Sequence, residues 1–471
     1  MFKRCLYLVF CFATIASYSQ GTSSQEIVSK DEKTLLHGKL ANELTYYIHK
    51  IQPAPTLGIS LIIKAGSVHE NEKEKGLCHL IEHMISGSLK FQGIELADKS
   101  CLVWNMLQPL SSFELTQFDF KIPSSLEKGL ESCLLTISDI PNSQLLNEIV
   151  LEKEKKEIIE GADHEDICLM KLEKALVSLE YPAYQCSIPG DDQGVCSNAT
   201  LEQVQNFHKT WYQPHRMAII VVGDIDVSAT QKLIENLFGK MTSSSTSLTI
   251  PPKEIVASQS SRALLYIDKN LQDSRIFLSK PMPRMIPRES LIFDIRIRLF
   301  QAYLDSLVES KSVYFKEPYY ELLPYPQVLR FIVTLPDDQY LEAFDDLSSF
   351  INYLKNPRSP FFDTITQVLF EQVKTEIRNG LANLPPEAIQ HQLVTFYRDI
   401  FVKNHDFIQP CDPAEKIRIL DSISLQDVKD DIHKLHEFSK ELLASHSVEV
   451  VKRCTGTKDI PENKEKEIGT Q

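Results

Sequence analysis

The sequence predicts an α+β fold with a duplicated architecture: two similar α/β-sandwich-like domains, each a mixed or antiparallel sheet covered by helices. The chain has 471 residues, more than one compact core usually holds. Its two halves show a similar order of strands and helices, although no repeated motif is evident. A stretch rich in serine, threonine and proline, residues 241–257, lies between the halves and is typical of a linker.

The composition describes a folded protein and argues against one class of partner. Hydrophobic residues make up 43% of the chain and charged residues 24%, which is ordinary for a globular protein. The net charge of −14 disfavours nonspecific binding to nucleic-acid phosphates. The sequence also lacks a basic patch interleaved with aromatic residues. We therefore expect no nucleic-acid partner.

The first residues are typical of a secretory signal peptide, which we place at residues 1–19. Lys3 and Arg4 precede a short apolar run, and small residues surround the expected cleavage after Ser19. The run is short for a membrane-spanning helix, and no later segment is apolar for long enough to span a bilayer. We expect an exported protein, periplasmic or secreted, with no stable membrane insertion.

Export permits disulfides. Cys186 and Cys196 flank a short loop and form the one pair that we name, with two free thiols as an equally open alternative. Asn198 would be a glycosylation acceptor only in a eukaryotic secretory pathway.

Hydrophobic periodicity divides the chain into a first domain, residues 30–240, a second domain, residues 258–455, and a charged tail, residues 456–471, which we expect to be disordered. In the first domain we expect strands over residues 43–50, 56–66, 111–123 and 216–226, and helices around 79–85 and over 125–140 and 143–160. In the second we expect strands over residues 262–268, 274–280, 328–336 and 446–453, and a long helix over 289–310.

The chemical signal lies in the stretch "GLCHLIEHMISGS", residues 76–88. On a helix, positions four apart share a face, so His79 and His83 could bind one metal ion, most plausibly zinc. Glu82 leans toward the same face and could act as general base toward a metal-bound water, whose pKa the metal lowers. The alternative is an ordinary amphipathic helix that matches by chance. The preceding apolar strand and charged loop favour the metal site.

A third ligand must come from elsewhere, and the acidic helix over residues 143–160 offers several carboxylates. Most of them are expected to be solvated and paired with lysines at helical spacing. One or two would point into the site.

At this point the sequence resembles the pitrilysin/insulinase family of inverted zincins, most closely its two-domain processing-peptidase members. The family pattern G-L-x-H-x-x-E-H-M-x-x-x-G-[ST] is matched from Gly76 to Ser88. The stretch "LANELTYYI" resembles the family's opening strand, with Glu43 in place of a glycine. "IKAGSVHE" is similar to the second strand and its loop, and "NFHKTWYQPHRMAIIVVGDID" is similar to a later strand. The resemblance covers residues 34–240 well and the second half weakly.

The resemblance implies a metalloendopeptidase with one Zn²⁺ per chain. His79 and His83 would be ligands, and Glu82 would be the catalytic base. The family's third ligand is a glutamate some seventy-odd residues later, which points to Glu160. Members usually carry a second glutamate seven positions earlier, where this chain has Lys153. The alternatives Glu157 and Glu154 therefore stay open.

The resemblance also implies how peptides bind. Gln108 and Ser111 stand at the family's substrate-binding edge strand, and we expect a peptide to add to the strand "SSFELTQFDF". Tyr314 matches a family tyrosine that orients the substrate, but Leu307 replaces its arginine companion. Two-subunit members divide these residues between chains. We therefore expect peptide substrates and a homologous partner subunit or a homodimer, with a non-hydrolytic peptide-binding subunit as the alternative function.

Overall fold

In the computed structural model, the described residues include both sheets and the helices that pack on them. The predicted signal peptide, the proposed Cys186–Cys196 pair and the tail lie outside the described residues, and Glu160 is described in its backbone only. The described residues are 34–71, 73–95, 107–141, 143–161, 198–242, 262–268, 273–281, 285–311, 313–314, 316–324, 327–336, 346, 349, 366–430 and 448–452.

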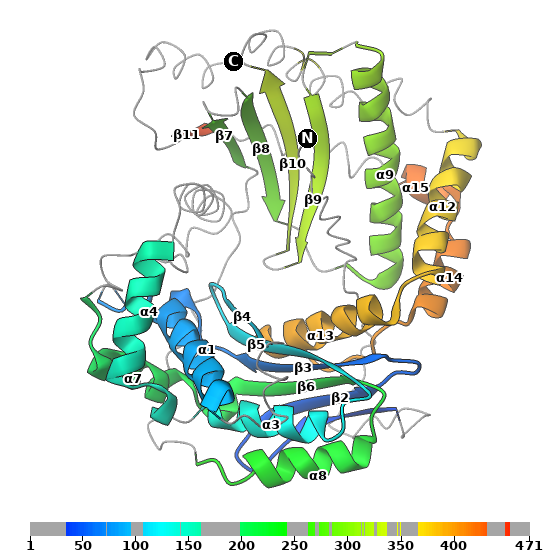
Figure 1. The fold of residues 1–471 in the computed structure, drawn as a ribbon. Coiled ribbons are helices and arrows are strands. Elements are labelled where there is room, and N and C mark those ends of the chain that lie inside the picture. The colour runs from blue at the N-terminus through cyan, green and yellow to red at the C-terminus, as the bar shows by residue number, and fades with distance from the viewer. Residues whose placement is uncertain are drawn as a thin grey trace.

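The first half of the chain forms a six-stranded mixed sheet in the order β1-β2-β6-β3-β5-β4 (Figure 1). Strands β2 and β6 run parallel, and all other neighbours are antiparallel. In chain order the strands are β1 (Leu35–Lys39), β2 (Thr45–Lys50), β3 (Thr56–Ile63), β4 (Leu107–Ser111), β5 (Thr116–Pro123) and β6 (Met217–Gly223).

Alternation along the central strands sends apolar side chains to both faces of this sheet. In β3, Ile59 and Leu61 belong to one buried cluster and Ile62 to another on the opposite face. The first cluster includes side chains from the helices that cover that face (Figure 1). These helices are α1 (Leu77–Glu95), α3 (Gly129–Asp139), α4 (Glu148–Gly161), α7 (Leu201–Trp211) and α8 (Val227–Phe238).

The opposite face is covered by α13 (Pro386–Val402), a helix from the second half of the chain (Figure 1). The amide Nε2 of Gln390 donates to the carbonyls of Thr56 and Val222, at 2.8 Å each. Further along α13, the Tyr397 hydroxyl lies 2.7 Å from His49 Nδ1. The first sheet therefore depends for one of its two covers on a helix whose contacts with it span 168 to 348 positions of the sequence.

The second half forms its own mixed sheet in the order β11-β7-β8-β10-β9, flanked by further helices (Figure 1). Its strands are β7 (Arg262–Asp268), β8 (Asp273–Pro281), β9 (Lys316–Pro324), β10 (Gln327–Pro336) and β11 (Val448–Lys452). Its helices are α9 (Pro287–Glu309), α12 (Gln367–Ala382), α14 (Pro413–Asp421) and α15 (Leu425–Asp430). Two mixed sheets with helical covers confirm the predicted α+β, duplicated architecture. Among the described helices, none is both long and apolar enough to cross a membrane.

One predicted strand was wrong. Residues 111–123 do not form a single strand: the chain turns back between Ser112 and Leu115, so that β4 and β5 make a hairpin. In the described sheet β4 is therefore the edge strand on this side, and most of the predicted edge strand belongs to β5, which lies inside the sheet. The period-two pattern hid the turn because its apolar side chains continue across it.

At two positions of the family-like stretches the backbone conformation favours glycine. Glu43 has a φ of 68°, in the left-handed region that glycine adopts most easily, and it stands where the family has glycine. Gly223 ends β6 with a φ of 153°, and a Cβ there would lie 2.6 Å from Leu57 Cδ2. The β1–β2 turn is thus made with a strained residue, whereas the turn after β6 keeps its glycine.

Candidate metal centre

Helix α1 carries the histidine pair. Over residues 77–85 its apolar side chains are fully buried, which fixes the rotation of the helix against the sheet and leaves the histidines on a partly open side. The residues that make this contact are Leu77, Cys78, Leu80, Ile81, Met84 and Ile85. Helical spacing then brings one ligand atom each from His79, Glu82 and His83 within 4.8 Å of one another, as the sequence predicts.

The spacing of the two imidazoles fits a zinc ion. His79 Nε2 lies 3.2 Å from His83 Nε2, and the two rings are perpendicular. Two nitrogens that bind one tetrahedral zinc at about 2.0–2.1 Å stand about 3.3 Å apart. Burial, with a smaller effect of His83, lowers the pKa of His79 to about 4, so its ring is neutral at neutral pH. A neutral imidazole offers the lone pair that a metal needs.

A carboxylate from α4 lies behind His83. Glu154 Oε2 is 3.5 Å from His83 Nδ1, on the side of the ring away from His79. This contact is the largest influence on the pKa of His83, which is raised although burial opposes the rise. Burial pushes the pKa of Glu154 upward, but the partners His83 and Lys153 outweigh it, and the pKa is lowered. An ionised Glu154 can hold the His83 ring in orientation, as carboxylates behind metal-bound histidines do.

Gly87 explains how α4 approaches α1 so closely. A Cβ at this position would collide with Glu154 Oε1, so any other residue would require the buried carboxylate to move from its present position. The next residue, Ser88, donates its hydroxyl to the carbonyl of Leu145 at 2.6 Å, just before α4 begins. The glycine and serine that end the motif thus join the two helices of the site.

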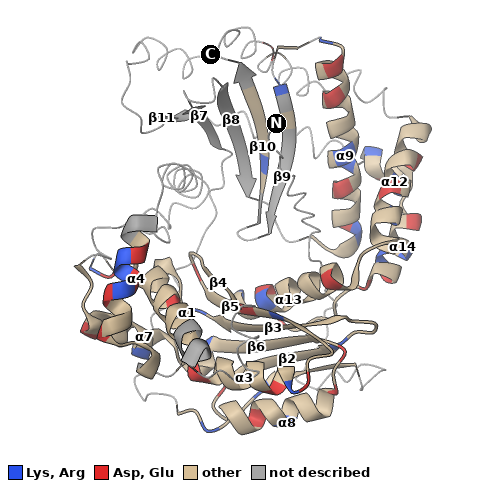
Figure 2. Cartoon of the chain, in the orientation of Figure 1, with Lys and Arg blue, Asp and Glu red and all other residues tan. Residues whose placement is uncertain are grey.

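The other carboxylates of α4 differ in their surroundings. Figure 2 shows basic and acidic residues interleaved along this helix. Glu157 is 56% exposed and pairs with Lys153 at 3.3 Å, while Glu152 pairs with Lys155 at 2.8 Å. The side chain of Glu160 lies outside the described residues. Of the three carboxylates that the sequence nominates, the described structure brings Glu154 to the histidines, at Nδ1 of His83.

The predicted base also contacts the edge strand. Glu82 is 7% exposed, and Ser111 at the end of β4 donates its hydroxyl to Glu82 Oε2 at 3.3 Å. Gln108 lies on the same strand with an exposed side chain. Tyr314 follows α9 in the second half, where its side chain is 48% exposed and its backbone N–H donates to Asp346 at 2.7 Å. The fold thus joins Ser111 to the motif directly.

Sequence reasoning missed one residue of the site. The two carboxylate oxygens of Glu70 accept hydrogen bonds from the backbone N–H groups of Gly76 at 2.9 Å and Cys78 at 2.8 Å. These groups belong to the first turn of α1, where no intrahelical acceptor exists and a negative charge is favourable. Glu70 lies outside the usual capping spacing, so a search for a local cap would overlook it.

Replacing Glu70 with alanine is expected to lower the free energy of unfolding by about 1–3 kcal/mol and to weaken zinc binding. The physical reason is that two N–H groups at the start of α1 lose a charged acceptor. Urea unfolding and zinc titration measure the two effects. Glu74→Ala, a partly buried glutamate in the same loop whose carboxylate accepts the Asn71 N–H at 3.2 Å, is the comparison and should lower both quantities less. Equal effects of the two substitutions would contradict a special role for Glu70.

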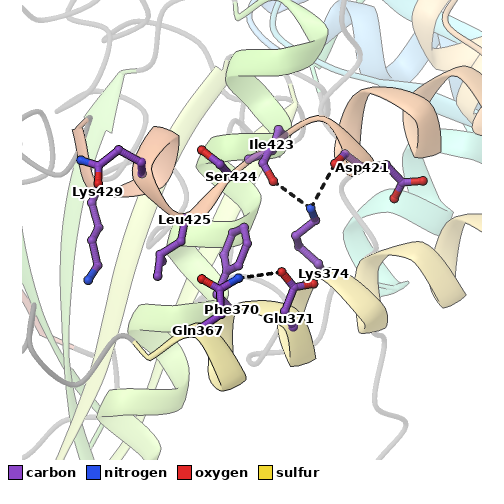
Figure 3. A pocket seen from close by; sticks show the side chains of 10 residues that line it. Gln367, Phe370, Glu371, Lys374, Asp421, Ile423, Ser424, Leu425 and Lys429 are labelled. Atoms are coloured by element: carbon purple, nitrogen blue, oxygen red, sulfur yellow. Dashed lines mark hydrogen bonds between the residues drawn. The ribbon is translucent and has the colours of Figure 1, made fainter.

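A hollow lies between α12 and the α14–α15 segment (Figure 3). Its volume is about 530 Å³. The buried Lys374 lines it and points its ammonium group toward backbone carbonyls. Lys374 Nζ donates to the carbonyls of Ile423 at 2.8 Å and Asp421 at 3.4 Å, at the end of α14. A cation here stabilises the helix C-terminus. The pocket therefore has a structural explanation for its most distinctive side chain.

Comparison with known proteins agrees with this geometry. Residues 46–187 match the family described as Insulinase (Peptidase family M16), and residues 198–377 match the Peptidase M16 inactive domain. A probable zinc protease PqqL of Haemophilus influenzae is 24% identical over 452 residues, which cover 89% of this chain and 48% of the relative. An uncharacterized zinc protease of Rickettsia bellii is 22% identical, covering 83% of this chain and 92% of that protein. The chain thus spans about half the length of the first relative.

Solved structures share the fold. The periplasmic protease PqqL of Escherichia coli superposes with a TM-score of 0.69 at 18% identity, over 93% of this chain and 50% of that one. A protease from Helicobacter pylori gives 0.65 at 16% identity, over 85% and 96%. The two family matches lie side by side along the sequence, and the histidine pair falls within the first. The chain belongs to the pitrilysin/insulinase family.

Proposed function

We propose that this chain is a zinc metalloendopeptidase that hydrolyses peptide bonds in peptides or unfolded segments. One observation carries the proposal: two imidazole nitrogens 3.2 Å apart share a helix face with a buried carboxylate, next to the edge of a sheet. His79 and His83 would hold the ion, with Glu160 as third ligand and Glu154 behind His83. We assign one Zn²⁺ to each chain.

Each residue has a distinct task in this proposal. A zinc ion at the site would polarise the substrate carbonyl and lower the pKa of a bound water. Glu82 takes the proton of that water and passes it to the leaving amine. Ser111, which donates to Glu82 at 3.3 Å, holds the carboxylate in place between proton transfers. Glu154 keeps the His83 ring oriented.

The peptide would bind as an added strand on β4, the edge of the first sheet in the described structure. Gln108 and Ser111 lie on this strand, and Tyr314 would approach from the second half. Main-chain pairing recognises the backbone more than the side chains, so we expect loose sequence specificity. This mode suits extended or unfolded segments.

The chain would act with a second copy or with a homologous subunit. The support is the resemblance of the sequence to two-subunit members of the family, which divide the substrate-orienting residues between two chains. Leu307 also stands where the resemblance predicts an arginine, which a partner could provide. Export to a periplasm or out of the cell, suggested by residues 1–19, agrees with the periplasmic location named for the Escherichia coli neighbour.

Leu307 also supports a second candidate function, a non-hydrolytic subunit that binds peptides. The two candidates differ in metal dependence. Removing metal with a chelator should abolish peptide cleavage and added zinc should restore it, if the chain is a peptidase. Zinc-free protein that cleaves equally well, or zinc-loaded protein that cleaves no peptide with or without its partner, would contradict the leading proposal.

Substitutions of the three carboxylates of α4 should change the zinc affinity to different extents. We expect Glu160→Gln to remove most zinc binding, because it deletes a ligand. We expect Glu154→Gln to weaken binding about 10- to 100-fold, because it frees the His83 ring. Glu157→Gln, at an exposed ion pair, is the control. Chelator competition with zinc measures each affinity. If Glu160→Gln still binds zinc fully, another carboxylate must be the third ligand.

A further inference from the structure

We propose that Pro109 interrupts the peptide-binding edge of β4, so that a bound peptide pairs with the main chain at Ser111 and cannot continue as a regular strand past Pro109. The inference rests on the proposed function and deepens it. It predicts that only a short stretch of the peptide backbone, around the bond to be cut, pairs with β4.

The hairpin decides which backbone groups of β4 face outward. Ser112 donates its N–H to the carbonyl of Leu115 at 2.8 Å, which makes these two residues a hydrogen-bonded pair. Every second residue along an antiparallel strand repeats that direction. Leu110 and Gln108 therefore point their main-chain groups toward β5, opposite Gln117 and Asp119. The residues between them, Leu107, Pro109 and Ser111, point theirs away from the sheet.

Proline at an outward position has two consequences for an added strand. Pro109 has no N–H, so the peptide carbonyl opposite it finds no donor. Its ring also occupies the place where that donor would lie, and natural sheets use edge prolines to stop further pairing. The next outward N–H belongs to Leu107, about 13 Å along the strand from that of Ser111. The edge is thus divided into two separated pairing points.

The pairing point at Ser111 lies beside the chemistry. Its hydroxyl contacts Glu82, whereas Leu107 is buried in the cluster beneath α1. A peptide held at Ser111 has its backbone next to the catalytic carboxylate. Pairing that is limited to this point aligns the bond to be cut without requiring a long extended segment. Pro109 is in this sense a specificity-determining residue.

The test measures binding of fluorescently labelled unfolded peptides to zinc-loaded Glu82→Gln protein, which should bind without cleaving. Adding Pro109→Ala restores one N–H donor and removes the ring, and should lower Kd about three- to tenfold. Kd should also change its dependence on peptide length. Shortening the peptide from the end that extends along Pro109 and Leu107 should leave Kd unchanged with Pro109 and raise it with alanine.

Pro123→Ala is the matched control, because Pro123 ends β5 and is exposed, away from the β4 edge. It should change neither Kd nor the length dependence. If Pro109→Ala binds no more tightly, or merely associates with itself through the freed edge, the inference is overturned while the proposed function stands. If the zinc-loaded Glu82→Gln protein binds no peptide at all, the proposed function and the inference fail together.

Discussion

Replacing Glu82 with glutamine is expected to lower kcat/KM for peptide hydrolysis about 10²- to 10⁴-fold, the usual contribution of a general base. Glutamine keeps the size of the side chain and can still accept the hydrogen bond from Ser111. It cannot take a proton from water. Zinc should stay bound, because the proposed ligands His79 and His83 are unchanged. Peptide cleavage and zinc content, measured on the same preparations, separate the loss of chemistry from the loss of metal.

Glu131→Gln, on the exposed side of α3, is the control for removing one negative charge. It should leave both measurements unchanged. A Glu82→Gln enzyme that keeps its activity would show that another group activates the water. A variant that loses its zinc together with its activity would instead make Glu82 part of the metal-binding set.

Replacing Tyr397 with alanine is expected to lower the free energy of unfolding by about 3–5 kcal/mol, the range for removing a large buried aromatic side chain. Tyr397 is fully buried, and its ring stacks on Tyr47 at a centroid distance of 4.9 Å. Burial lowers the pKa of His49 to about 4, so its Nδ1 can accept the bond from the tyrosine hydroxyl at 2.7 Å. The substitution removes both of these contacts of Tyr397 with the first sheet, while the hydrogen bonds of Gln390 to the sheet remain.

Tyr397→Phe isolates the polar part of this effect. It keeps the ring but leaves His49 Nδ1 without the hydroxyl, which should cost about 1–3 kcal/mol. Urea unfolding, followed by circular dichroism, gives both values. Losses below about 0.5 kcal/mol in both variants would show that the Tyr397 contacts contribute little to the stability of the first sheet. Losses of the expected size would show that the two halves of the chain stabilise each other.

Contacts between residues close in sequence were predictable, and contacts between residues far apart in sequence were not. The contacts of His79, Glu82 and His83 with one another depend on helical spacing alone, so the pattern predicted them. The central strands β2, β3 and β6 were also predicted, because their apolar runs are nearly continuous. Strand β1 was missed, and β4 and β5 were merged, because their patterns are short and a turn separates them without glycine or proline.

The sequence by itself determined the chemistry of the site: a histidine pair and a carboxylate on one helix face, within stretches typical of one peptidase family. Only the tertiary structure decided which partners surround that face. Glu154 reaches His83 because Gly87 lets α4 approach, Glu70 binds the first turn of α1 across a loop, and α13 covers the first sheet from the other half of the chain. The physical reason is that periodicity encodes contacts within one element, whereas contacts between elements depend on how buried faces pack.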